Sequence, residues 1–232
     1  TQQHYAETTM KSADALLKLI NDILDISKME AGKIELEIVP FNMQNLVEDV
    51  LSIIAPKCHE DNIELLLRIE PGTHKFVKGD PGRVRQILLN LLSNALKFTS
   101  KGYILLTVSS DAITEANTNF RFEITDTGIG IPEDKQKRIF NKFDQAALMD
   151  GEIGVESISG KGSTFWFTIQ LDQAPERHAP QLGRDTKILQ NLNTLIVDDC
   201  EISHTIIQEQ LHHLNMNCTH LMSANEALQA LE

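Results

Sequence analysis

The sequence predicts an α+β fold, in which helices and strands pack against one another. Two observations carry this prediction. Residues 82–98 place apolar side chains at the spacing of a helix with one buried side. Residues 120–126 alternate apolar and polar side chains, which is the pattern of a strand with one buried face. Further helical and strand patterns follow one another along the chain, so we expect both kinds of element to share a core.

The composition disfavours several classes of protein. The chain has 232 residues, of which 41% are hydrophobic, as expected for one to three domains with packed cores. Its net charge of −12 argues against nucleic acid as a partner. Cys58, Cys200 and Cys218 lack metal-ligand spacing and are expected to be free thiols in a reducing compartment. No apolar run is long enough to cross a bilayer, so we expect a soluble chain, alone or as part of a membrane-tethered parent.

Residues 12–29 are predicted to form a helix with a long apolar stripe. The stripe follows a near-heptad spacing, and Gly32 is a suitable C-terminal cap. Such a helix needs apolar partners, which a helical bundle across a dimer would supply; an ordinary core helix is the alternative. The stripe consists of Ala13, Leu16, Leu17, Ile20, Ile23, Leu24 and Ser27, widened by Leu19 and Ile26.

The segment from this helix to residue 126 is predicted to alternate strands and helices. Pro40 is expected to end the first strand. Asp80 is a candidate N-cap for a helix that starts at Pro81. In order, the predicted elements are a strand at 34–38, a helix at 44–54, a strand at 63–69, a loop at 71–80, the helix that ends at 98, and strands at 103–109 and 119–126.

The helix that ends at residue 98 carries a polar column opposite its apolar side. Asn90, Asn94 and Lys97 stand at positions i, i+4 and i+7, so their side chains converge. An amide oxygen can ligate Mg²⁺, and an ammonium can meet a phosphate. The pattern predicts a ligand surface, with a merely polar helix face as the alternative.

Asp126 ends its strand on the face that carries Phe120, Phe122 and Ile124. A buried carboxylate needs a hydrogen-bond donor, and an adenine amino group would supply one. The glycines of the Asp-x-Gly-x-Gly sequence that starts at Asp126 permit close approach of the backbone to a ligand. An Asp-Thr-Gly turn that only ends the strand is the alternative.

Together, the two stretches resemble the N box and the G1 box of the ATP-binding domain of histidine kinases. That domain has the Bergerat fold, which is shared with DNA gyrase, the Hsp90 chaperones and MutL. The resemblance therefore implies an α/β sandwich, in which a mixed sheet carries helices on one face. The resemblance implies ATP and Mg²⁺ as cofactors, with Mg²⁺ on Asn94 helped by Asn90, and with Asn90 and Lys97 as catalytic residues. Asp126 would read adenine, and Ser163 would support it. The implied ATP-binding residues are Asn90, Asn94, Lys97, Phe98, Asp126, Gly128, Gly130, Ile131 and Ser163.

The resemblance continues beyond residue 131, with one interruption. A predicted helix at 132–140 leads into residues 139–143, which resemble the F box of the family. The ATP lid and the Gly-rich G2 box should follow, but they are missing between about Ala146 and Ala147, through natural loss, engineering or omission. Without the Gly-rich loop, we expect weak binding of the γ-phosphate. Two predicted strands, at 152–157 and 163–171, close the domain.

The C-terminal part resembles the start of a receiver domain. A strand at 194–199 ends in Asp198 and Asp199, and a helix at 202–214, a strand at 218–222 and a helix at 224–231 follow. The family likeness implies that both carboxylates bind Mg²⁺ beside a phosphorylatable Asp, which this chain lacks. The predicted fold of this part is therefore a partial doubly wound α/β domain, which follows the sandwich in the sequence.

Four segments are predicted from this pattern. Residues 1–33 would hold the second helix of a dimerisation domain, since 19–33 resemble it, while the first helix with its phosphoacceptor His is absent; His4 is expected to be a surface residue. The other segments are the ATP-binding domain at 34–172, a linker at 173–190 and the partial receiver domain at 191–232.

The resemblance implies a hybrid sensor histidine kinase of two-component signalling. It would transfer the γ-phosphate of ATP to a His and then to a receiver Asp. The implied partners are a second copy, bound through the N-terminal helix, and its own or a partner's receiver or phosphotransfer domain. We expect a cytoplasmic location, with any membrane contact made only through a parent segment. A non-catalytic dimerisation module is one alternative. An ATPase of the gyrase type is less favoured, because Asn90 stands where those enzymes carry a Glu base.

Overall fold

The computed structural model describes residues 36–112, 114, 116–139, 151–174 and 189–231. Internal contacts divide the chain into Thr1–Ile38 and Val39–Glu232. The predicted dimerisation helix at 12–29 and the linker core at 175–188 lie outside the described residues. In the part that is described, no helix has the length and apolarity needed to cross a membrane.

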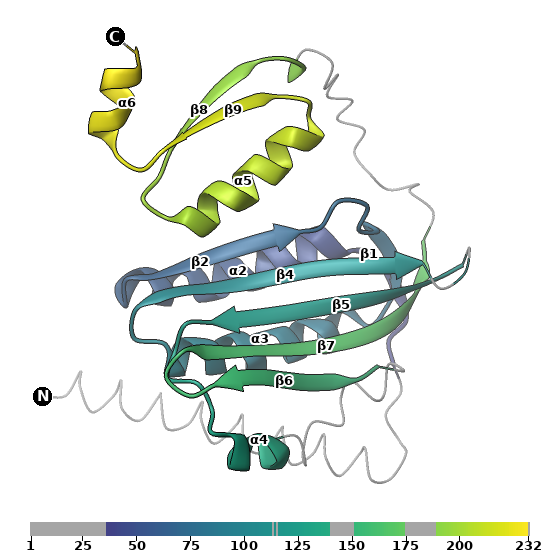
Figure 1. The fold of residues 1–232 in the computed structure, drawn as a ribbon. Coiled ribbons are helices and arrows are strands. Elements are labelled where there is room, and N and C mark those ends of the chain that lie inside the picture. Colours follow the sequence, from purple (N-terminus) through teal and green to yellow (C-terminus); the bar gives the residue numbers. More distant parts are fainter. Residues whose placement is uncertain (1–35, 113, 115, 140–150, 175–188, 232) are drawn as a thin grey trace, which may run out of the picture. The chain divides into compact units, whose positions relative to one another are not determined.

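A mixed seven-stranded sheet forms the centre of the fold (Figure 1). Six strands lie in the order β1-β3-β7-β5-β4-β2, and β6 pairs with β7. The β2–β4 pair is parallel and the other pairs are antiparallel. The strands are β1 (Val39–Asn42), β2 (Ile63–Ile69), β3 (Phe76–Gly79), β4 (Gly102–Ala112), β5 (Asn117–Asp126), β6 (Ile153–Ile158) and β7 (Gly162–Gln173).

Two long helices, α2 (Met43–Glu60) and α3 (Pro81–Phe98), cover one face of this sheet (Figure 1). The predicted α+β class, with helices on one face, is confirmed. The strand β5 shows how the sequence builds the core: Phe122 is fully buried, and its ring stacks on that of Phe167 with centroids 4.6 Å apart. The alternation along β5 thus puts its aromatic side chains against the helices.

The start of α3 follows the predicted capping pattern. The Asp80 carboxylate accepts a hydrogen bond from the Arg83 backbone N–H at 3.0 Å, and Pro81 occupies the first turn. At the other end, the backbone N–H and the hydroxyl of Thr99 both donate to the carbonyl oxygen of Ala95. These caps satisfy end groups that the helix itself leaves unpaired.

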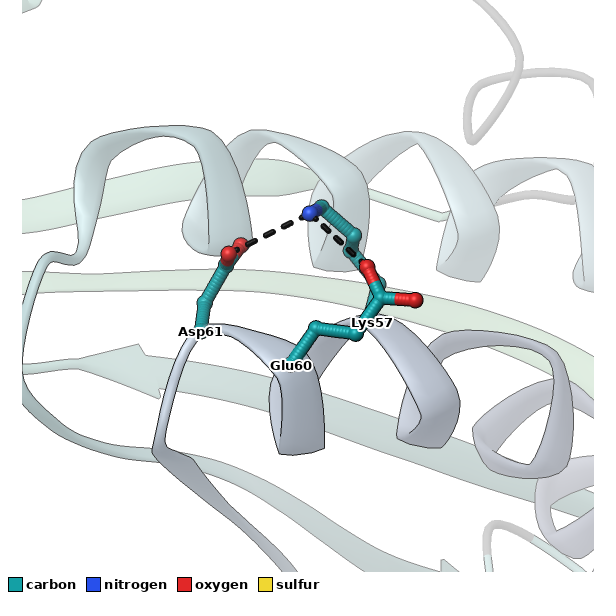
Figure 2. Close-up of polar contacts among 3 residues, drawn as sticks. All are labelled: Lys57, Glu60 and Asp61. Carbon is teal, nitrogen blue, oxygen red and sulfur yellow. Dashed lines mark hydrogen bonds and ion pairs between the residues drawn. The ribbon is translucent and has the colours of Figure 1, made fainter.

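The helix α2 is longer than the predicted 44–54, because it continues through Pro56. Beyond the proline, Cys58 is buried in the core. The Lys57 ammonium donates to Glu60 at 3.1 Å and to Asp61 at 3.2 Å (Figure 2). These bonds raise the pKa of Lys57, that with Glu60 most strongly. Pro56 has no backbone N–H and so removes one hydrogen bond of the helix. The burial of Cys58 and the contacts of Lys57 stabilise the turn that follows it.

The first strand differs from the prediction at 34–38. Residues 36–38 are not in a strand, Ile34 lies outside the described residues, and Pro40 is inside β1. The strand β1 pairs with β3 and lies at one end of the sheet order, a position at which proline is tolerated in strands. Its partner β3 was missed, because its four residues lie in the segment 71–80 that was predicted as a loop.

The C-terminal part forms a separate two-stranded parallel sheet of β8 (Asn193–Val197) and β9 (Asn217–Leu221). The helix α5 (Glu201–His213) connects the strands, and α6 (Ala224–Leu231) follows. The predicted order of strand, helix, strand and helix is confirmed.

Candidate functional site

A cavity of about 380 Å³ opens between α3, the segment that follows β5, and the start of β7. This volume lies within the usual range of about 300–1,000 Å³ for small-molecule sites. Apolar side chains form most of its wall, and a few polar groups point into it. The residues that line it are Leu91, Asn94, Phe98, Asp126, Ile129, Gly130, Ile131, Pro132, Lys135, Ser163 and Phe165.

Asp126 is the buried acid of this cavity, with 5% of its surface exposed. Its Oδ1 accepts a hydrogen bond from the Gly128 backbone N–H at 2.8 Å, and the Ser163 N–H acts on the same carboxylate. Burial raises the pKa of Asp126, and the two N–H groups oppose that rise. A carboxylate has about four acceptor sites, so one further donor in the cavity can still be bound.

The glycines beside Asp126 are required by the packing of the loop. A Cβ on Gly128 would overlap the carbonyl of Phe98, and one on Gly130 would overlap the carbonyl of Ile158. Gly130 also has a φ of 63°, which favours glycine. We predicted that these glycines allow a ligand to approach the backbone closely. The structure shows that they also allow close contacts with the protein's own backbone.

Ile131 is fixed from both sides. Its N–H donates to Ser157 Oγ at 2.8 Å, and its carbonyl accepts from Gln136 Nε2 at 2.8 Å. Ser157 Oγ lies 2.9 Å from Ser163 Oγ. Ser157 is on β6, while Gln136 is on the short helix α4 (Glu133–Ile139). The cavity wall is therefore tied to two neighbouring elements.

Six of the nine predicted ATP-binding residues line the cavity, and they are Asn94, Phe98, Asp126, Gly130, Ile131 and Ser163. Asn90, Lys97 and Gly128 are not among the lining residues. The Lys97 ammonium lies 5.2 Å from the centre of the Phe98 ring, on an exposed side chain. The column predicted on α3 thus reaches the cavity only through Asn94, and the binding roles remain predictions.

Sequence reasoning missed five lining residues, which are Leu91, Ile129, Pro132, Lys135 and Phe165. Lys135 is the cation among them. Lys135 lies three residues after Pro132, in the first turn of a helix that follows a Gly-rich loop. This position in the sequence could have predicted that Lys135 lies at the site. Leu91 and Phe165 were assigned to the apolar core, where their patterns place them.

The predicted metal ligands differ in their surroundings. Asp198 accepts hydrogen bonds from the Cys200 backbone N–H at 2.8 Å and from the Ser203 hydroxyl at 3.1 Å, while Asp199 is exposed. Within the described ranges, no group of three or more His, Cys, Asp and Glu side chains is placed to hold a metal ion. A Mg²⁺ ion on Asp198 and Asp199, or on Asn90 and Asn94, remains a prediction.

Comparison with known proteins identifies the domain that contains this cavity. Residues 79–173 match the family described as histidine kinase-, DNA gyrase B-, and HSP90-like ATPase. The chain is 36% identical over 232 residues to the sensor protein GacS of Pseudomonas syringae pv. syringae, and 39% identical over 197 residues to the signal transduction histidine-protein kinase BarA of Escherichia coli. The chain contains a histidine kinase catalytic domain. The cavity lies in the segment that the family match covers, so it belongs to an ATP-binding domain.

The histidine kinase relatives are longer than this chain. The matches cover 90% of the chain for GacS and 75% for BarA, but only 25% and 22% of those proteins. A crystal structure of full-length ShkA in complex with AMPPNP has a TM-score of 0.79 and 30% identity. That match covers 98% of this chain and 50% of the ShkA chain.

Proposed function

We propose that the chain is the ATP-binding core of a hybrid sensor histidine kinase, which transfers the γ-phosphate of ATP to a His and then to a receiver Asp. The observation that carries the proposal is the buried Asp126 carboxylate in an apolar cavity of about 380 Å³. An apolar cavity with one buried carboxylate favours an apolar ligand that carries a hydrogen-bond donor, and the adenine base with its amino group fits this description.

The residues present fit ATP with Mg²⁺. Asp126 would accept from the adenine amino group, and Ile131 and Phe165 would pack on the base. The Asn94 amide would hold Mg²⁺, with Asn90 one turn away on the same helix. Bound Mg²⁺ would supply neutralisation of phosphate charge. Lys135 would meet the phosphates, a role that the sequence had assigned to Lys97.

We expect the proposed site to bind the γ-phosphate of ATP weakly. The alignment with the histidine kinase GacS of Pseudomonas protegens runs over 257 residues, more than the 232 of this chain, so that protein carries residues with no counterpart here. This supports the missing lid and G2 box that the sequence places between Ala146 and Ala147. Residues 140–150 lie outside the described part. We expect the γ-phosphate to add little to the affinity.

The partners follow from the same proposal. Two copies would associate through the helix predicted at 12–29, and a His on a segment not present in this sequence would accept the phosphate. The receiver would be the domain that β8 begins or one on another protein. A solved complex of the histidine kinase ThkA with the response regulator TrrA is similar in fold, at a TM-score of 0.52. We place the protein in the cytoplasm, where ATP is available.

Calorimetric titration of the chain with ADP and with a non-hydrolysable ATP analogue tests the proposal. Both nucleotides should bind with similar affinity, and Asp126→Asn should weaken both. Asp111→Asn is the matched control, because Asp111 is an exposed acid on the same sheet. No binding by the native chain would refute an ATP site. Absence of phosphate transfer to an intact His-containing partner would leave the non-catalytic dimerisation module as the function.

A further inference from the structure

The side chain of Gln136 ties two separate segments of the nucleotide domain together. Its Nε2 donates to the carbonyl oxygens of Ile131, at 2.8 Å, and of Ser157, at 2.9 Å. A primary amide has two N–H donors, so both are used. Ile131 lines the cavity and Ser157 is on β6, which α4 contacts (Figure 1). Gln136 itself does not line the cavity.

The hydroxyl of Ser157 extends the connection towards Asp126. It donates to the carbonyl oxygen of Gly162 at 2.9 Å. A hydroxyl has one hydrogen, so the 2.9 Å contact with Ser163 Oγ must use the hydrogen of Ser163. Ser163 pairs with Asp126 across β5 and β7. Since its hydroxyl hydrogen goes to Ser157, Ser163 supports the Asp126 carboxylate through its backbone N–H.

We propose that Gln136 and Ser157 are positioning residues of the nucleotide site. They hold both backbone polar groups of Ile131, and through Ile131 and Ser163 they set the distance between the wall of the cavity and Asp126. This inference rests on the proposed ATP site and adds two residues that touch no nucleotide. Neither residue is in the N box, the G1 box or the F box that the sequence resembles.

Replacement of Gln136 separates this role from general packing. Gln136→Met keeps the length of the side chain and removes both donors, so the affinity for ADP should fall about tenfold, the factor that 1.4 kcal/mol represents. Gln136→Glu places a carboxylate against two carbonyl oxygens, which should weaken binding further while the acid is ionised. A protonated Glu regains one donor, so part of the affinity should return in acid.

The measurement is the ratio of the variant's Kd for ADP to that of the native chain, by calorimetry, from about pH 8 to about pH 5. The ratio cancels the titration of Asp126, which both proteins share. For Gln136→Glu, this ratio of Kd values should decrease as the pH is lowered. For Gln136→Met, it should stay constant. The same two substitutions at Gln170, exposed on β7, should leave the ratio near one.

The outcomes separate the two proposals. A native chain that binds no ADP refutes the ATP site and this inference with it. A native chain that binds ADP, with both Gln136 variants equal to it at every pH, overturns the positioning role and leaves the ATP site standing. Ser157→Ala, which removes the acceptor of the Ile131 N–H, gives a second reading if either Gln136 variant fails to fold. Ser157→Ala should lower the affinity for ADP several-fold. An unchanged affinity would also overturn the positioning role.

Discussion

Asp126→Ala and Asp126→Asn should differ in stability although both remove the same charge. In the native domain, the carboxylate accepts from the Gly128 N–H at 2.8 Å and faces the Ser163 N–H. Alanine leaves these buried donors without an acceptor. Asparagine keeps an oxygen at the Oδ1 position. The comparison of the two variants therefore separates the role of the oxygen as a hydrogen-bond acceptor from the role of the negative charge.

The expected magnitude follows from the hydrogen bonds. An unsatisfied buried donor costs about 1–3 kcal/mol, and removal of the costly buried charge offsets part of this, so we expect Asp126→Ala to lose about 2 kcal/mol. At about 2–4 °C per kcal/mol for a domain of this size, the midpoint should drop by about 4–8 °C. Asp126→Asn should stay within about 1 kcal/mol of the native domain.

The pH dependence supplies a sign that can be checked. Burial raises the pKa of Asp126, so the folded state favours the protonated form. The contribution of this group to stability is present below its unfolded pKa and is lost as the pH rises through the folded pKa. Asparagine has no such loss. Asp126→Asn should therefore gain stability relative to the native chain as the pH rises through that interval.

Thermal unfolding at several pH values, with Asp111→Asn as the control, measures both effects. Equal midpoints for Asp126→Ala and Asp126→Asn would refute the claim that the carboxylate supports the loop. A difference between Asp126→Asn and the native chain that does not change with pH would refute the effect of burial on its pKa. Nucleotide binding is measured on the same samples, so a loss of affinity in a stable Asp126→Asn assigns the charge to ligand recognition.

Three further predictions concern the scaffold of the site. Asp80→Ala removes the cap on the Arg83 N–H and should cost about 1 kcal/mol in urea denaturation; an unchanged midpoint would contradict the capping role. Phe122→Ala empties a fully buried position and should cost about 3–5 kcal/mol, and a loss below about 1 kcal/mol would show a looser core. Gly154→Ala directs a methyl group into the ring of Trp166, the single tryptophan of the chain, and should lower stability and change its fluorescence; a native spectrum and midpoint would contradict this contact.

The fold was predictable where the pattern of one element determined its surroundings. The apolar stripe of α3 and the alternation of β5 placed both elements, because each requires a buried face. The edge strands were not predictable in this way. Pro40 was expected to end the first strand, yet it lies inside β1, because β1 is at the end of the sheet, a tertiary fact that local sequence does not contain. The same limit applies to Pro56, which α2 passes because Cys58 beyond it is buried.

The candidate site was predictable only in part, for a geometric reason. Spacing on α3 showed that Asn90, Asn94 and Lys97 share a side of the helix, but not how far along the helix the cavity reaches. In the structure it reaches Asn94 and Phe98. Lys135 comes from another element, so only the folding of the loop after β5 brings it to the same cavity.

The glycine loop shows that a family motif can carry a structural requirement beside its predicted role in binding. Gly128 and Gly130 were predicted to allow close approach of a ligand, and a Cβ at either would also meet the protein's own backbone, at Phe98 or Ile158. The Ile129 N–H donates to the carbonyl of Phe98 at 3.2 Å, which joins the loop to the end of α3. The glycines therefore build the wall on which Asp126 is displayed. On this account, a larger residue at Gly128 would displace the end of α3 and Phe98 first, and the affinity for nucleotide would fall as a consequence.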